Sequence, residues 1–308
     1  MQRTLRRGFD GMLWAALLLP TLFWAGNFIV ARAARGEVPP FALAFARWGI
    51  AFLCLLPFAW AAVRRDAAWY RANWFTVLWI GVPGVTGFNT LVYIGLQYTT
   101  ATNGMLLNST TPALILVLGA LFWGRGMTLV QILGLAISTL GVTTVILHGE
   151  PARLITLDFS RGDLIIFLAM VCWAVYTLGL TLIPPQINRL GLLTVHSGIT
   201  TVLLLPFLIW EISAGRVPSF SPGALAAMAY VGVVPSVLAT LLYMKGVALA
   251  GPARVGQFIH LLPVYGAVLS MIFLGEPLHL YHAVGFALIL AGIVLAGRTG
   301  AAKAPARG

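Results

Sequence analysis

The sequence predicts an all-α integral membrane protein of ten transmembrane helices, arranged as two inverted five-helix repeats. Three observations predict this fold class. Of the 308 residues, 60% are hydrophobic and 9% are charged, whereas soluble domains carry about 25% charged residues. The apolar residues form ten runs near the length of about 20 residues that a helix needs to cross a bilayer. The same series of residues also occurs twice, which indicates an internal duplication.

Short turns separate most of the apolar runs. The first run has a basic start but no small-residue cleavage site, so we expect an uncleaved span rather than a signal peptide. A longer polar stretch at 148–161 is predicted to link a first repeat (1–147) to a second (162–298), and we expect residues 299–308 to form a disordered tail. The predicted spans are 12–33, 40–63, 74–96, 102–123, 127–147, 162–183, 190–212, 222–245, 252–275 and 279–298.

The duplication becomes visible when the sequence is shifted against itself. A shift of 149 residues places Trp24 on Trp173 and Arg47 on His196, and a shift of 151 places Pro112 on Pro263. Because five is an odd number, the second copy must enter the membrane from the opposite side. This inverted arrangement is typical of secondary transporters, whose substrate site lies at the midplane between the repeats.

The distribution of positive charge predicts the orientation, because cytoplasmic loops carry an excess of lysine and arginine. With both termini in the cytoplasm, the outer loops hold five basic residues and the inner ones thirteen. The outer residues are Arg32, Arg35, Arg153, Arg161 and Arg216. The inner ones are Arg3, Arg6, Arg7, Arg64, Arg65, Arg71, Arg125, Arg189, Lys245, Arg254, Arg298, Lys303 and Arg307.

Several spans carry polar or aromatic side chains at the spacing of one helix face. Polar groups are costly in hydrocarbon, so we expect these side chains to line a shared cavity. The alternative is that they only join helices through hydrogen bonds, which average about 0.6 kcal/mol each. The eighth span shows the pattern at Ser236, Thr240 and Tyr243. The predicted substrate-binding residues are Asn27, Arg47, Asn89, Tyr93, Asn103, Asn108, Trp173, Tyr176, Tyr243, Gln257 and His260.

Pro112 and Pro263 take the same place in the two repeats. A proline inside a helix removes one backbone hydrogen bond, here freeing the carbonyls of Asn108 and Ile259. We expect a bend in both spans. The functional interpretation is a hinge with a free carbonyl, and the structural one is a static bend.

Arg47 lies inside the second span, without an acidic residue nearby in the sequence. An intramembrane arginine is a functional candidate, and its planar fork suits a carboxylate or phosphate; alternatively it caps freed carbonyls or reaches an interface. His196 and His260 are possible proton relays because histidine titrates near neutrality, although a buried histidine is more often a packing residue. We find no acidic residue deep in a span, which leaves histidine-coupled antiport or passive exchange.

The cysteines and the net charge limit the ligands and partners that we expect. Cys54 and Cys172 lie in apolar runs and predict neither a disulfide nor a metal site. The net charge of +11 is spread between spans, so we expect no nucleic acid, and no cofactor is predicted. The expected partners are a small-molecule substrate and the lipid bilayer. Small residues such as Gly134 and Gly285 in the fifth and tenth spans predict close helix packing, or a homodimer face.

Three stretches carry a family resemblance: FWAGNFIVARAA at 23–34, FARW at 45–48, and LLPVYGAVLSMIFLGEPL at 261–278. They resemble the drug/metabolite transporter superfamily, specifically its ten-span EamA-type members. One departure is Arg125, in FWGRGM, where that family usually has glutamate. The resemblance implies a carrier of the bacterial inner membrane with a cavity between spans 1, 3, 4, 6, 8 and 9. It does not define the substrate, since members export amino acids and other metabolites.

The expected function is alternating-access export of a small amphipathic metabolite, with an amino acid as the first candidate. A nucleotide-sugar or phosphorylated-metabolite exchanger is the alternative within the superfamily, and a membrane receptor or scaffold is the alternative outside transport. An intramembrane enzyme is disfavoured, because the spans contain no GxSxG, no HExxH and no aspartate pair.

Overall fold

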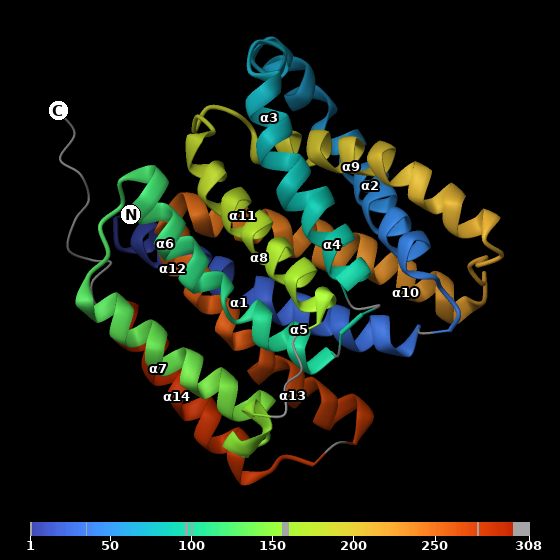
Figure 1. Cartoon of the computed structure of the whole chain (residues 1–308). Coiled ribbons are helices and arrows are strands. Elements are labelled where there is room, and N and C mark those ends of the chain that lie inside the picture. The colour runs from blue at the N-terminus through green and yellow to red at the C-terminus, as the bar shows by residue number, and fades with distance from the viewer. Residues whose placement is uncertain are drawn as a thin grey trace.

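The computed structural model describes residues 2–34, 36–95, 98–99, 101–155, 160–275 and 277–297. The side chains at 2–10, 28, 31–33, 93, 101–103, 105 and 274 lie outside this description. Every regular element in the described ranges is helical (Figure 1). The predicted all-α membrane fold is confirmed.

The first repeat forms eight helical elements. They are α1 (Gln2–Ala33), α2 (Pro40–Ala72), α3 (Trp74–Gly81), the π-helical η1 (Val82–Gly87), α4 (Phe88–Gly95), α5 (Ala101–Asn108), α6 (Thr111–Trp123) and α7 (Leu129–Ile146).

A short 3-10 helix, η2 (Pro151–Leu154), precedes the second repeat. The elements that follow are α8 (Arg161–Gly179), η3 (Leu180–Leu182), α9 (Arg189–Ser213), α10 (Pro222–Val233), the π-helical η4 (Val234–Leu238), α11 (Ala239–Ala250), α12 (Pro252–Gln257), the 3-10 helix η5 (Phe258–Leu261), α13 (Leu262–Leu274) and α14 (Leu280–Gly297).

Nine helical stretches of the described chain are long and apolar enough to cross a membrane, and Gly11–Asn27 in α1 is a tenth, shorter one. Large apolar side chains such as Phe58, Phe122 and Leu280 are exposed, as expected of a surface that faces lipid. At about 1.5 Å per residue, α2 is about 50 Å long, more than the hydrocarbon core of about 30 Å. Its end beyond the predicted span therefore projects from the membrane.

The packing of the helices follows the duplication. The second spans of the two repeats, α2 and α9, pack against each other, as do the fifth spans, α7 and α14 (Figure 1). The first span, α1, packs on α11 and α13 of the second repeat, and its counterpart α8 packs on α4 and α6 of the first. This exchange of partners is the reciprocal pairing that an inverted duplication produces.

The glycines of α7 and α14 allow the two helices to approach closely. A Cβ added at Gly134 would lie 2.7 Å from the Gly292 carbonyl oxygen, and one at Gly141 would lie 2.6 Å from that of Gly285. The predicted close packing is therefore realised within one chain. Because these glycines face each other, they do not form a homodimer face, and the predicted homodimer would need another surface.

Two carboxylates connect the ends of the antiparallel pair α2–α9. Asp66 on α2 accepts a hydrogen bond from the Asn188 N–H at 2.9 Å, where α9 begins. Glu211 on α9 accepts one from the Ala42 N–H at 2.8 Å, where α2 begins. Each helix thus supplies a negative cap to the N-terminus of the other.

Glu211 is a buried acidic residue near the end of a predicted span. It lies inside the seventh predicted span, and its side chain is 0% exposed. The expectation that no acidic residue lies deep in a span is not contradicted, because Glu211 is the last residue but one of that span; what the sequence does not predict is its burial. The burial has a tertiary cause: the Ala42 N–H at the start of α2 donates to the carboxylate, and the hydropathy of α9 alone does not indicate this contact.

Candidate functional site

The third and eighth spans each contain a wide π-helical turn, η1 and η4. Both turns begin with a valine and a proline, Val82–Pro83 and Val234–Pro235. Proline has no N–H to donate to the preceding turn, so the helix widens there. π-Helical turns are frequent at functional sites, and here they occur at matching places in the two repeats.

Arg47 binds residues of both spans. Its Nε donates to Ser236 Oγ in η4 at 2.7 Å, and its Nη1 donates to Asn89 Oδ1, just after η1, at 3.1 Å. Asn89 in turn donates to the Val85 carbonyl at 2.7 Å, and Ser236 donates to the Val231 carbonyl at 2.7 Å. The buried Arg47 guanidinium therefore links the two repeats at their π-helical turns. Two predicted site residues, Arg47 and Asn89, are therefore in contact, and their binding of substrate, including an anion contact of Arg47, stays a prediction.

A cluster of aromatic rings lies beside this link. Trp24 and Trp173, which the 149-residue shift aligns, meet edge to face with ring centres 5.3 Å apart. Trp173 also contacts Phe88 at 5.0 Å, Tyr176 at 5.2 Å and Tyr243 at 5.3 Å. The rings come from α1, α4, α8 and α11, so four spans meet here. Three predicted site residues, Trp173, Tyr176 and Tyr243, are thus brought together.

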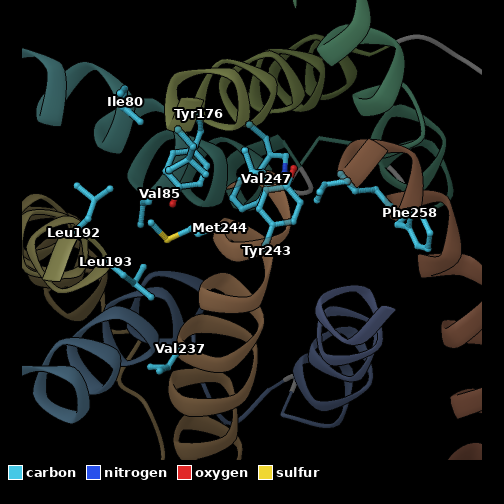
Figure 2. Close-up of a cluster of buried hydrophobic side chains, with 14 of the residues drawn as sticks. Ile80, Val85, Tyr176, Leu192, Leu193, Val237, Tyr243, Met244, Val247 and Phe258 are labelled. Atoms are coloured by element: carbon cyan, nitrogen blue, oxygen red, sulfur yellow. The ribbon is translucent and has the colours of Figure 1, made fainter. Parts of the chain in front are cut away.

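The aromatic cluster, defined as Trp24, Phe88, Trp173, Tyr176 and Tyr243, is also held by polar contacts. Trp24 Nε1 donates to the Pro235 carbonyl of η4 at 3.1 Å. The Tyr243 hydroxyl lies 2.8 Å from Thr177 Oγ1. Figure 2 shows Tyr176 and Tyr243 inside the buried core. The cluster therefore combines ring faces with the polar backbone of a π-helical turn.

The fourth and ninth spans are broken rather than bent at Pro112 and Pro263. In the fourth span, α5 ends at Asn108 and α6 begins at Thr111; in the ninth, η5 separates α12 from α13. Each proline is the second residue of the helix that follows the break, where a missing N–H is tolerated. The predicted bend is therefore a helix end and a new start, and the hinge stays a prediction.

His260 joins the two breaks. Its Nε2 lies 3.0 Å from the Ser109 carbonyl oxygen and its Nδ1 lies 2.7 Å from Ser138 Oγ on α7. A carbonyl can only accept, so Nε2 carries the proton of this bond. His260 and Ser109 are 151 residues apart, and the 151-residue shift aligns them. Equivalent positions of the two repeats are thus in direct contact.

His196 is buried in a different way. Its Nε2 donates to the Val77 carbonyl at 3.1 Å, and its Nδ1 has no hydrogen-bond partner within the described residues. Gly81 provides the space for the ring, because an added Cβ there would lie 2.4 Å from it. The two possible relay histidines thus differ: His260 connects repeats through both nitrogens, and His196 through one.

The other predicted site residues take part in none of the contacts described above. Gln257 is buried, and Asn27 and Asn108 are half-buried. The side chains of Tyr93 and Asn103 lie outside the described part of the chain. The structure therefore brings the predicted residues together in three groups: Arg47 with Asn89, the aromatic cluster, and the helix breaks around His260.

Two half-buried polar residues were not predicted as site residues. Arg189, at the start of α9, donates from Nη2 to the Ile183 carbonyl at 2.9 Å. Tyr70 lies near the end of α2, and burial raises its pKa to about 12. The sequence marks Arg189 only as a basic residue at the edge of a span, and it marks Tyr70 as part of a cytoplasmic loop.

Comparisons with known proteins agree with this architecture. The profile of the EamA-like transporter family matches residues 10–147 and again residues 160–298. A solved structure titled "Crystal structure of protein" has a TM-score of 0.75 at 19% identity, covering 94% of this chain and 96% of that one. At this identity the likeness shows the fold.

Curated relatives extend the match over nearly the whole chain. The uncharacterized transporter YyaM of Bacillus subtilis is 29% identical over 287 residues, which is 92% of this chain and 93% of the relative. An uncharacterized transporter of Archaeoglobus fulgidus is 28% identical, covering 91% and 95%. A probable terminal-alkyne amino-acid exporter of Streptantibioticus cattleyicolor is 27% identical, covering 93% of each. The chain therefore belongs to the EamA-like transporter family of the drug/metabolite transporter superfamily: it is a multi-pass membrane transporter and not an enzyme.

Proposed function

We propose that this transporter exports a small amphipathic metabolite, with an amino acid as the first candidate, by alternating access between its two repeats. One observation carries the proposal. Arg47 joins Ser236 of the second repeat to Asn89 of the first beside the aromatic cluster. A buried link between repeats, next to a cluster of aromatic and polar side chains, lies where the substrate sites of inverted-repeat carriers are found, at the interface between the repeats.

The chemistry of the cluster favours an amphipathic solute. The ring faces of Trp24, Trp173 and Tyr243 suit an apolar or cationic group. The hydroxyls and amides of the neighbouring π-helical turns can hydrogen-bond a polar group. The name of the Streptantibioticus cattleyicolor relative, an amino-acid exporter, supports the same class of substrate at low identity.

Alternating access follows from the reciprocal packing. Arg47 on α2 binds the eighth span, and its repeat partner His196 on α9 binds the third span through Val77. Rocking of one repeat against the other would exchange these contacts. We place the termini in the cytoplasm from the charge count, and the direction of export rests on the family resemblance.

The test uses the purified full-length protein in liposomes. A panel of amino acids, nucleotides, sugars and drugs is first screened for a rise in the apparent melting temperature, which binding to the native state produces. Each ligand found is then tested by counterflow of its labelled form. We expect counterflow of an amphipathic solute, lost in Arg47→Ala and retained in the control Arg216→Gln, whose exposed side chain packs on Trp210.

Other outcomes decide between the alternatives. Counterflow restricted to nucleotide sugars or phosphorylated metabolites would select the exchanger of the same superfamily. A ligand that raises the melting temperature without any flux would favour a receptor or scaffold. Flux that is unchanged in Arg47→Ala would remove Arg47 from the proposed mechanism.

A further inference from the structure

The fifth spans of the two repeats, α7 and α14, begin with the same capping contact. In α7, the side chain of Gln131 accepts a hydrogen bond from the Thr128 N–H at 3.0 Å. In α14, Nδ1 of His282 accepts one from the His279 N–H at 2.9 Å. The 151-residue shift places Thr128 on His279 and Gln131 on His282. The two contacts are therefore equivalent: in both, the third residue of the helix binds the N–H of the residue that precedes the helix.

The two capping side chains differ in their response to a proton. The amide of Gln131 does not titrate near neutrality, whereas an imidazole ordinarily takes up a proton at about pH 6.5. A neutral imidazole has one nitrogen that accepts a hydrogen bond, but an imidazolium only donates. The bond from the His279 N–H therefore exists only while Nδ1 of His282 is unprotonated. A protonated ring would also place positive charge at the positive end of the helix dipole.

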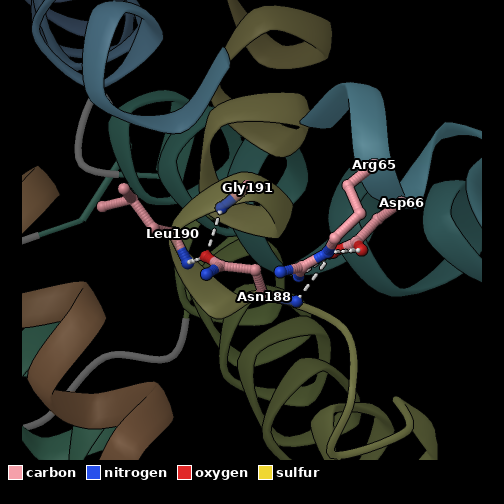
Figure 3. A network of polar contacts seen from close by, with 5 residues as sticks. All are labelled: Arg65, Asp66, Asn188, Leu190 and Gly191. Atoms are coloured by element: carbon pink, nitrogen blue, oxygen red, sulfur yellow. Dashed lines mark hydrogen bonds and ion pairs between the residues drawn. The ribbon is translucent and has the colours of Figure 1, made fainter. Parts of the chain in front are cut away.

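The other side-chain caps of the described helices use no imidazole. At the start of α9, the Asn188 amide oxygen accepts from the Leu190 N–H at 2.9 Å and from the Gly191 N–H at 3.1 Å (Figure 3). The Ser221 hydroxyl caps α10, and the Asp163 carboxylate takes part in the cap of α8. None of these chemical groups ordinarily titrates between about pH 5 and pH 8. Among these caps, the start of α14 is therefore the one with a pH-sensitive chemical group.

A second imidazole also uses Nδ1 as an acceptor, at the end of α7. There Nδ1 of His148 lies at hydrogen-bond distance from Nη1 of Arg153. A guanidinium only donates, so Nδ1 is the acceptor of this bond. Arg153 Nε also donates to Glu150 Oε2 at 2.7 Å. Proton uptake by His148 would therefore break its contact with Arg153 and leave the pair of Arg153 and Glu150.

Tyr281 brings the two imidazoles together. Its ring centre lies 4.2 Å from that of His282, 5.3 Å from that of His148 and 5.4 Å from that of His279. A Cβ added at Gly149 would approach Cβ of Tyr281 to 3.0 Å, so the backbone at the end of α7 lies directly against the start of α14. We call His148, His279, Tyr281 and His282 the histidine cluster.

The charged groups beside the histidine cluster do not offset its protonation. Arg153 and Glu150 pair with each other, so their charges cancel while the imidazoles are neutral. Glu276 lies outside the described residues. The elements packed against α14 add no carboxylate within the described chain, because α7 has no titratable side chain. The titratable or charged residues of the other packed elements are Tyr265 of α13, His260 of η5 and Arg254 of α12.

We propose that His282 and His148 form a proton-responsive contact between the two fifth spans. While both imidazoles are neutral, their Nδ1 atoms accept the His279 N–H and the Arg153 guanidinium, and Tyr281 contacts both rings. After proton uptake both acceptors are lost, and the imidazoliums repel each other and Arg153. The start of α14 is then loosened from the end of α7.

The inverted repeats place the starts of α7 and α14 at opposite membrane faces. With both termini in the cytoplasm, as the charge count predicts, the His282 cap faces outside and the Gln131 cap faces the cytoplasm. Helix α7 also carries Ser138, the partner of His260 at the break of the ninth span. The contact therefore gives the protein a response to external pH that does not depend on which solute it carries.

The test is hydrogen–deuterium exchange of the full-length protein in nanodiscs at about pH 7.5 and about pH 5.5, on either side of the ordinary imidazole pKa. Rates are converted to protection factors, which removes the intrinsic pH dependence of exchange. We expect protection at residues 279–284 to fall by about three- to tenfold at the lower pH, because most of an ordinary imidazole is then protonated. Residues 128–133, the equivalent stretch of the first repeat, should keep their protection.

Exchanging the two cap residues gives the matched variants. His282→Gln supplies the amide that the first repeat uses, so the start of α14 should stay protected at both pH values. Gln131→His should transfer the pH dependence to the start of α7. His282→Ala removes the acceptor and should lower protection at both pH values by about two- to tenfold. His148→Gln tests the second imidazole and should reduce the pH effect without abolishing it.

Two results would overturn the assignment. One is equal protection of residues 279–284 at both pH values in the parent, and the other is the same pH dependence in His282→Gln as in the parent. If Gln131→His does not fold, the comparison of the parent with His282→Gln still decides. The measurement needs no solute, so failure of the proposed export would leave this contact standing, and a pH-independent cap would leave the export proposal intact.

Discussion

Two arginines of the α2–α9 pair have different surroundings. Arg47 is bound by side chains from both repeats, Ser236 and Asn89. Arg189 binds one carbonyl, and its Nη1 is buried without a partner in the described part of the chain. The residue that lies deeper in its span is therefore the one that the protein itself engages. The difference teaches that the position of an arginine in its span does not tell whether its donors are used. The hydrogen-bond partners do, and among the described residues they leave a buried donor at Arg189 but not at Arg47.

Removal of the Arg47 link is expected to have the largest effect. Arg47→Ala leaves the Ser236 hydroxyl and the Asn89 amide without the cation that joins them, and we expect at least about 3 kcal/mol of destabilisation from the hydrogen bonds to a charged group. Solute flux should be abolished. The measurements are the apparent melting temperature and counterflow in liposomes. A variant as stable and as active as the parent would show that the link has no role.

The contact between the helix breaks is expected to come next. His260→Leu removes the hydrogen bonds to Ser109 and Ser138, and each unsatisfied buried partner costs about 1–3 kcal/mol. We expect a lower melting temperature and slower counterflow. Ser138→Ala removes only the Nδ1 contact and should have the smaller effect. Equal stability of His260→Leu and the parent would contradict the role assigned to His260.

Overpacking beside His196 tests the packing of the residue that aligns with Arg47 in the second repeat. Gly81→Ala would place a Cβ 2.4 Å from the His196 ring, and overpacking of this kind costs about 1–3 kcal/mol. His196→Ala in the same chain should recover part of the lost stability, as determined from melting temperatures of the single and double variants. If the stability losses of the two single variants simply add in the double variant, the His196 ring is not the group that the new Cβ displaces.

The smallest effect is expected at Asp66, beside Arg189. The hydrogen bond from Arg65 lowers the pKa of Asp66, and the Asn188 N–H acts in the same direction. Because the folded pKa lies below the unfolded value of about 3.9, the stabilisation is present above that value and is lost as the pH falls through the folded pKa. Asp66→Asn should cost about 1 kcal/mol at neutral pH, and the difference from the parent should disappear in acid. A difference independent of pH would show that the charge is not involved.

Most of the architecture can be predicted from the sequence, because a helix that crosses lipid must have a certain length and an apolar surface. The apolar runs and the two shifts predict ten spans and the inverted repeats. The spacing of polar and aromatic residues selects Trp173 and Tyr176 on one face of the sixth span, and the structure places both in the aromatic cluster. The fold prediction succeeds because period and hydropathy are local properties, whereas the substrate-binding role of these residues stays a prediction.

The failures concern tertiary contacts. The carboxylate of Glu211 is buried because it caps another helix, and no property of its own span indicates this. Arg189 has the same sequence signature as any basic residue at a membrane boundary. Pro112 and Pro263 predict a bend, but a proline is also favourable as a helix start, and the preceding residues decide which occurs. The binding of His260 to the Ser109 carbonyl favours the break.

The contact between Ser109 and His260 has a consequence for the energetics of a reversing carrier. When two inverted halves exchange conformations, a contact contributed identically by both favours neither facing of the protein. Here one half contributes only a backbone oxygen and the other an imidazole, so the exchange does not return the same interaction. Under the proposed alternating access, the divergence of this single pair after duplication would therefore give the inward- and outward-facing forms unequal free energies, and with them a preferred resting orientation.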